Sequence, residues 1–116
     1  MLVGVLADAS LCATAQTETR PALVGKTTQS ATVDLAQLKG KVVLLFFWST
    51  DCSVCLDKLP ELRRNLDGWR GKDFVIVAVN QDRSSAELRA YEQVLDKVAP
   101  PNAQMKIVLA PRRSPP

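Results

Sequence analysis

Histidine is absent from this chain of 116 residues, and its absence excludes several kinds of chemistry at once. Without an imidazole there is no histidine ligand for a metal, no histidine general base, and no Ser-His or Cys-His catalytic triad. The chain also lacks any apolar run close to the roughly 20 residues that a membrane-spanning helix needs. Its net charge of +3 is small, and no block of Lys and Arg alternates with aromatic residues, so the composition does not indicate nucleic-acid binding.

Cysteine is scarce: the chain has three, Cys12, Cys52 and Cys55. An odd number does not describe a framework of structural disulfides, so the fold must depend on its core, for which 47% hydrophobic residues are available. Cys52 and Cys55 form a close pair with two residues between them. Cys12 stands apart in the N-terminal segment, and we expect it to have no catalytic role.

Apolar runs and helical periodicity alternate along the middle of the chain. Residues 42–48 (VVLLFFW), 73–82 and 105–109 are predicted strands. Residues 55–67 predict an amphipathic helix, because leucines recur three or four residues apart. A second helix is predicted after the capping box that Ser84 and Glu87 form, and its apolar face comprises Leu88, Tyr91, Leu95 and Val98.

Less regular segments surround these elements. Residues 16–32 are polar and predict an extended segment or a loop, whereas residues 35–38 predict one helical turn that Gly40 ends. Pro60 lies inside the first predicted helix and is expected to kink it or to end its first turn.

The alternation of strands and helices predicts an α/β fold in which neighbouring strands are parallel and helices cover the sheet. Continuous apolarity in residues 42–48 indicates a strand buried on both faces. We therefore expect core positions at Leu44, Phe46, Phe47 and Val77.

Cys52 follows the first long strand, and Cys55 falls in the first turn of the helix after it. A helix N-terminus offers free N–H groups and partial positive charge, which stabilise a thiolate and should lower the pKa of Cys52. Asp51 opposes this effect if it lies close, and Lys58 could help it. In this interpretation Cys52 attacks a substrate disulfide and Cys55 resolves the mixed disulfide.

Two other interpretations compete with a redox dithiol. A zinc or iron–sulfur site needs about four ligands, and this chain offers two paired cysteines, a distant third and no histidine. Two inert buried thiols are the alternative without chemistry, but a pair across a strand-to-helix turn favours redox activity.

The stretch LAQLKGKVVLLFFWSTDCSVCLDKLPEL resembles the thioredoxin-like thiol–disulfide oxidoreductases of the TlpA/ResA type. The matching features are the lead-in at residues 35–41, Phe47-Trp48, the Cys52-x-x-Cys55 motif and Pro60, and the likeness covers about residues 20–109. The resemblance implies a thioredoxin-like fold, with a central, mostly parallel sheet flanked by helices. It also implies catalysis by the two cysteines, no organic cofactor and no metal. The candidate site wall consists of Trp48, Asp51, Ser53, Val54 and Pro60.

The resemblance also implies protein disulfides or dithiols as partners. Proteins of this type are commonly periplasmic or membrane-anchored on the outer face of the membrane; a cytoplasmic location is the alternative. In keeping with export, residues 1–19 are interpreted as a secretory signal, with Ala13-Thr14-Ala15 as a cleavage site, or else as a disordered segment. Residues 20–109 form the thioredoxin-like domain, and residues 110–116 a disordered tail.

Several positions depart from the family pattern. Ser53-Val54 stands where Pro often precedes the second cysteine, Asp51 where Trp is common, and Phe46 where thioredoxins carry a buried acid. Leu45 occupies the position where the peroxiredoxin branch has its proline, which argues against peroxidase chemistry. From the resemblance we also expect the family's cis-proline loop, C-terminal hairpin and helix to be missing, because Pro111 comes too early to supply that loop.

A missing C-terminal part has two expected consequences. Substrate binding should weaken, and one edge of the sheet should lie uncovered. The alternative function is therefore a truncated, non-catalytic thioredoxin-like module that acts by association with another chain, including a second copy of itself.

Overall fold

In the computed structural model, residues 22–111 are described. Their strands are β1 (Val24–Lys26), β2 (Thr32–Asp34), β3 (Val42–Trp48), β4 (Phe74–Asn80) and β5 (Met105–Leu109). Their helices are α2 (Ser53–Asn65) and α3 (Ser85–Val98), with single 3-10 turns at η1 (Leu35–Leu38) and η2 (Leu66–Trp69). Cys12, the segment 1–19 and most of the predicted tail lie outside the described residues.

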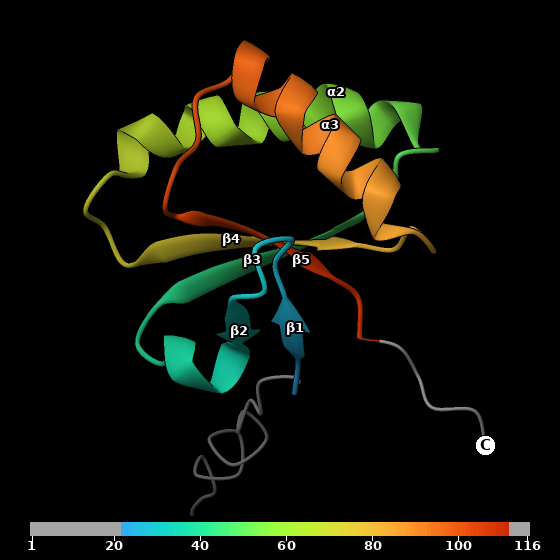
Figure 1. The fold of residues 1–116 in the computed structure, drawn as a ribbon. Helices are drawn as coiled ribbons and strands as arrows, with labels where there is room; N and C mark the ends of the chain where they lie inside the picture. Colours follow the sequence, from blue (N-terminus) through green and yellow to red (C-terminus); the bar gives the residue numbers. More distant parts are fainter. Residues whose placement is uncertain (1–21, 112–116) are drawn as a thin grey trace, which may run out of the picture.

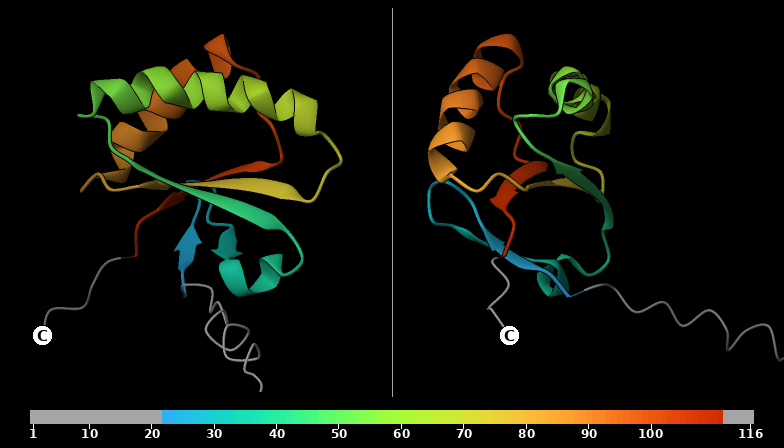
Figure 2. Two further views of the ribbon diagram at one scale, coloured as in Figure 1. Left: turned by 180° about the vertical axis from the view of Figure 1, so that it is seen from behind. Right: turned by 90° about the vertical axis from the view of Figure 1, so that its right-hand side faces the viewer.

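The strands form one sheet in the order β2-β1-β5-β4-β3. β3, β4 and β5 are parallel neighbours, whereas β1 runs antiparallel to both β2 and β5. Helices α2 and α3 cover one face, and η1 lies on the other face together with the β1–β2 hairpin (Figures 1 and 2). The predicted α/β fold with parallel strands is confirmed.

The β1–β2 hairpin makes the expectation of an extended segment or a loop over residues 16–32 more specific, because β1 and the start of β2 lie inside that range. Each of these strands has three residues and buries only one, so neither leaves a readable alternation in the sequence. The buried residue of β1 is Gly25, where an added Cβ would lie 3.0 Å from the Leu109 carbonyl oxygen. Glycine is needed there because the hairpin crosses β5 at close range.

The two helices begin and end close to the predicted positions. Cys52 is the N-cap of α2, so the helix begins two residues earlier than expected, and it continues through Pro60 instead of ending there. Ser84 caps α3 by accepting a hydrogen bond from the Ala86 amide at 3.2 Å. On the predicted apolar face of α3, Leu88 and Leu95 are buried, but Val98 is 51% exposed and that assignment was wrong.

The core has two parts, one on each face of the sheet. Between the sheet and the helices lie Trp48, Leu59, Leu66, Ile76, Ala78, Leu88, Leu95, Ala99, Met105 and Ile107. On the opposite face, β4 and β5 pack against the hairpin and η1 through Val33, Leu35, Val75, Val77, Val79 and Val108. Val77 is core as expected, and β4 is buried on both faces.

β3 contradicts the prediction of a strand buried on both faces. It pairs with β4 alone and forms the edge of the sheet among the described residues. Leu44 and Phe47, which were expected in the core, are 40% and 51% exposed, and Val42 is exposed as well. Phe46 packs partly against the helix-side core, and Trp48 is fully enclosed. An apolar run identifies a strand but does not tell a central strand from an edge strand.

Candidate functional site

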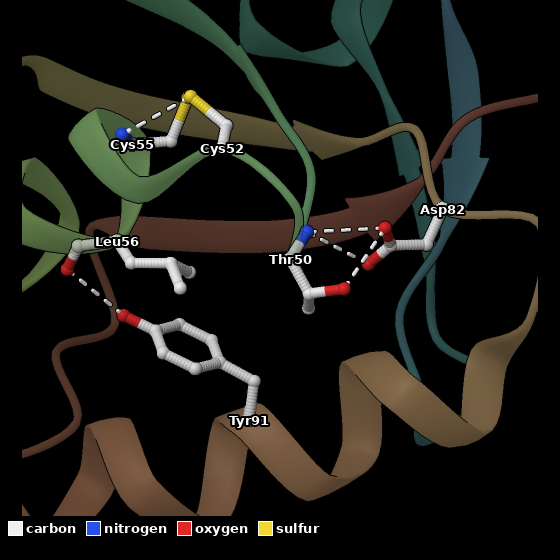
Figure 3. The surroundings of a disulfide bond; sticks show 6 residues. All are labelled: Thr50, Cys52, Cys55, Leu56, Asp82 and Tyr91. Atoms are coloured by element: carbon white, nitrogen blue, oxygen red, sulfur yellow. Dashed lines mark hydrogen bonds between the residues drawn. A yellow bond between two sulfur atoms is a disulfide. The ribbon is translucent and has the colours of Figure 1, made fainter.

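Cys52 and Cys55 lie where β3 ends and α2 begins, and they form a disulfide with Cα atoms 5.2 Å apart (Figure 3). This is the carboxyl end of a strand in a largely parallel sheet, where α/β folds usually place their chemistry. The expectation that the two-residue spacer brings both sulfurs together across a helix start is confirmed.

Hydrogen bonds fix the Cys52 end of the helix. The Cys55 amide donates to the Cys52 Sγ at 3.2 Å, and the Leu56 amide donates to the Cys52 carbonyl at 3.0 Å. The Cys52 amide in turn donates to the Ser49 carbonyl at 3.1 Å. Since an N–H group already points at the Cys52 sulfur, a thiolate formed there on reduction would be stabilised.

The predicted wall residues divide into exposed and enclosed groups. Asp51, Ser53 and Val54 are exposed beside the disulfide, and Val54 reaches 66% exposure. Pro60 is half-buried within α2, while Trp48 is 1% exposed and lies in the core beneath. Both cysteines are half-buried, and the two residues between them, Ser53 and Val54, are exposed.

A carboxylate that the sequence interpretation missed holds the loop before Cys52. Asp82 accepts hydrogen bonds from the Thr50 amide at 3.0 Å and the Thr50 hydroxyl at 3.1 Å (Figure 3). It also accepts one from the Asn80 side chain at 2.9 Å. Asp82 follows β4 just as Thr50 follows β3, and neighbouring parallel strands end at the same edge. The polar residues that directly follow two neighbouring parallel strands could therefore have indicated this contact from the sequence.

Tyr91 of α3 lies beneath the first turn of α2. Its ring packs against Trp48 with centroids 5.4 Å apart, and its hydroxyl donates to the Leu56 carbonyl at 3.2 Å. Burial raises the pKa of Tyr91 above its ordinary value, so the hydroxyl keeps its proton at neutral pH. The Trp48 indole N–H is buried and has no hydrogen-bond partner among residues 22–111.

Within residues 22–111 there is no group of three or more Cys, Asp or Glu side chains that could hold a metal ion. No helix in the same range is long and apolar enough to cross a membrane. The described part of the site therefore consists of the disulfide, its helix start and the Thr50–Asp82 brace.

With the disulfide placed at a helix start beside this sheet, the chain can be compared with known protein families. The model of the AhpC/TSA family matches residues 17–108. The chain belongs to the AhpC/TSA family. Solved structures agree with this assignment. A thiol:disulfide interchange protein from a Bacteroides species matches with a TM-score of 0.65 and 27% identity, over 79% of this chain and 57% of that one.

A second solved structure gives the same result. The thioredoxin domain of a thiol-disulfide oxidoreductase from Bacteroides vulgatus matches with a TM-score of 0.68 and 26% identity, over 81% of this chain and 63% of that one. The predicted thioredoxin-like fold is thereby confirmed for this AhpC/TSA family member.

Two curated relatives are similar to a little over half of this chain. The thiol-disulfide oxidoreductase ResA of Bacillus subtilis is 34% identical over 64 residues, which are 55% of this chain and 36% of ResA. The thioredoxin-like protein YneN of the same organism is 32% identical over 78 residues, 65% of this chain and 45% of YneN. The predicted resemblance to the ResA type is confirmed, and this AhpC/TSA chain spans less than half the length of these two relatives.

Proposed function

We propose that this chain is a thiol–disulfide oxidoreductase that uses Cys52 and Cys55 to reduce or exchange protein disulfides. The observation that carries the proposal is the disulfide at the N-cap of α2, with the Cys55 amide directed at the Cys52 sulfur. That geometry favours a thiolate at Cys52 once the pair is reduced. The relatives whose names describe this activity support it.

In the reductive direction the Cys52 thiolate attacks one sulfur of a substrate disulfide and releases the other as a thiolate, which takes up a proton. The Cys55 thiol loses its proton and attacks the Cys52 sulfur of the mixed disulfide. This step releases the second substrate thiol and leaves the Cys52–Cys55 disulfide. Two electrons have passed to the substrate, and an external dithiol must return the pair to its reduced form.

A disulfide-reduction assay with two variants tests the proposal. Under excess dithiol, Cys52→Ser should reduce a protein disulfide no faster than the dithiol alone, because the attacking sulfur is gone. Reduced Cys55→Ser, mixed with the protein disulfide without added dithiol, should instead accumulate a mixed disulfide that is visible by mass spectrometry, since the resolving thiol is gone. If the unaltered chain reduces the disulfide no faster than Cys52→Ser, the non-catalytic alternative replaces this function.

We also propose that the chain works outside the cytoplasm, in the periplasm or anchored at the outer face of the membrane. The support is its similarity to the ResA type and the small-x-small sequence Ala13-Thr14-Ala15. Fusion of residues 1–116 to a reporter enzyme that is active only after export tests this location. A reporter that stays inactive would favour the cytoplasm.

Association with a second copy is a further proposal, and β3 is the surface that would carry it. Its outer edge is unpaired among the described residues, with Val42 65% and Phe47 51% exposed. An antiparallel pair of β3 strands from two copies, centred on Leu45, would cover the unpaired edge of both strands. Such edge-to-edge pairing joins two sheets without a new fold.

Size-exclusion chromatography with light scattering at several concentrations tests the β3 pairing. The unaltered chain should shift toward a dimer as concentration rises, and Val42→Lys combined with Phe47→Lys should remain monomeric. Val94→Lys is the matched control, because Val94 on α3 is 54% exposed but distant from the sheet edge. A monomer at every concentration would contradict the proposal.

A further inference from the structure

Pro60 leaves a gap in the hydrogen bonding of the helix that carries the two cysteines. In an α-helix the N–H of each residue donates to the carbonyl four residues earlier. The donor for the Leu56 carbonyl should therefore be residue 60, which is proline and has no N–H. Leu56 directly follows Cys55, so the affected carbonyl belongs to the first turn of α2.

The Tyr91 hydroxyl fills this gap from the neighbouring helix. It donates to the Leu56 carbonyl at 3.2 Å, across 35 residues of sequence (Figure 3). The ring cannot easily turn away, because it is packed against the fully enclosed Trp48 with centroids 5.4 Å apart. The hydroxyl is therefore held where the missing amide would have been needed.

Leu56 also connects this contact to the sulfur. Its own amide donates to the Cys52 carbonyl at 3.0 Å, and the Cys55 amide next to it donates to the Cys52 Sγ at 3.2 Å. Tyr91 thus bonds to Leu56, and the adjacent amides of Leu56 and Cys55 both bond to Cys52, one to its carbonyl and one to its sulfur.

We infer that Tyr91 is a positioning residue for the Cys52–Cys55 pair, because its hydroxyl replaces the amide N–H that Pro60 lacks and so fixes the turn that stabilises a Cys52 thiolate. The inference rests on the proposed redox function of the pair. It assigns Tyr91 no contact with substrate, only an effect on the equilibrium between dithiol and disulfide.

Without the hydroxyl, the first turn of α2 should loosen and the Cys55 amide should be held less firmly at the Cys52 sulfur. The reduced form gains more from that amide than the disulfide does, because only the reduced form places negative charge on the sulfur. Tyr91→Phe should therefore shift the equilibrium with glutathione toward the disulfide, about three- to tenfold. It should also raise the pKa of the Cys52 thiol, measured by the pH dependence of alkylation.

Pro60→Ala supplies the matched background. Alanine restores the N–H at residue 60, so Tyr91→Phe in that background should change the glutathione equilibrium less than twofold. Arg64→Met is the control for general contact between the helices, because Arg64 donates to the Val98 carbonyl at 2.8 Å at the far end of α2. That variant should leave the equilibrium unchanged.

Two results would overturn the inference. One is an equal shift from Tyr91→Phe in the unaltered chain and in the Pro60→Ala background, and the other is a loss of stability without any shift in equilibrium. Unfolding by Tyr91→Phe in both backgrounds would likewise indicate a general packing role, whereas unfolding only where Pro60 is retained would support the inference. A chain that exchanges its disulfide with glutathione but reduces no protein disulfide would refute the proposed function and leave this inference standing.

Discussion

At the scale of single residues, the site depends on polar contacts that hold the loop around the cysteines. Cys52 and Cys55, the proposed redox pair, are half-buried, and the residue that braces the loop before them is Asp82, from the end of a different strand. Donors that lose a partly buried carboxylate partner cost free energy, so removing Asp82 should lower the stability of the fold.

Asp82→Ala should lower the free energy of unfolding by about 1.5–3 kcal/mol, because the Thr50 amide and hydroxyl and the Asn80 amide lose a charged acceptor. Thr50→Val is the matched comparison. It removes the hydroxyl but keeps the amide donor, so it should cost less. Urea unfolding followed by circular dichroism measures both, and equal stability of Asp82→Ala and the unaltered chain would contradict the brace.

Glu92 gives a pH-dependent prediction. Burial raises the pKa of Glu92 above its ordinary value of 4.5, and the hydrogen bond from the Thr28 hydroxyl at 2.9 Å only partly offsets this. As pH rises through 4.5, the unfolded chain releases this proton before the folded chain does. The free energy of unfolding therefore falls until the pH passes the raised pKa of the folded state.

Glu92→Gln should therefore stabilise the chain at pH 7 by roughly 0.5 kcal/mol, a small amount because the side chain is half-exposed and solvent screens the penalty. At about pH 3 the gain should vanish, since that lies well below the ordinary pKa of 4.5 and the carboxyl is protonated in both states. Asp73→Asn, in the exposed segment just before β4, is the control. Thermal unfolding at the two pH values measures the stability difference between Glu92→Gln and the unaltered chain. An equal difference at both pH values would show that the buried carboxylate is not its cause.

At the scale of elements, α2 has one buried side, and β1 has one position where only glycine fits. Leu59 is 0% exposed beneath α2, whereas Val54 on the same helix is 66% exposed. A Cβ added at Gly25 would lie 3.1 Å from the Val108 Cβ. A Cβ added at Gly68 would have no atom of the described residues within 4 Å.

Leu59→Ala should cost about 2–5 kcal/mol, because it leaves a cavity in the helix-side core. Val54→Ala, on the exposed side beside the disulfide, should change stability by less than about 0.5 kcal/mol. Denaturant unfolding measures both variants, and similar losses would mean that α2 does not pack on the side described.

Gly25→Ala should destabilise by about 1–3 kcal/mol, because the methyl group overpacks the crossing of β1 and β5. Gly68→Ala should be neutral or slightly stabilising, since it meets open space and restricts the unfolded chain. If Gly25→Ala proves as stable as Gly68→Ala, the hairpin does not lie as close to β5 as described.

At the scale of the whole molecule, two apolar layers on either side of β4 hold the fold, and the disulfide contributes little. The disulfide closes a loop with a sequence separation of only 3. The reduced chain should therefore keep its circular dichroism spectrum and lose at most about 2 kcal/mol of stability. Unfolding with and without excess dithiol measures the difference, and the Cys52→Ser/Cys55→Ser double variant should match the reduced chain. Unfolding on reduction would contradict this account.

The sequence by itself determined the elements and the position of the chemistry. Periodicity and apolar runs identified α2, α3, β3, β4 and β5, because helices and strands repeat their buried positions at different spacings. The cysteine spacing across a strand-to-helix turn identified the candidate site, since both sulfurs belong to one local segment.

Only the tertiary structure decided what depends on contacts between distant segments. β3 is an edge strand although its apolar run resembles that of a central strand. The short β1–β2 hairpin has no clear sequence pattern, and its place is set by pairing with β5. Asp82 and Tyr91 reach the site from far along the chain, with sequence separations of 32 and 35 from their partners. No local pattern records such a meeting, because strand order and helix packing, not neighbouring residues, bring those side chains together.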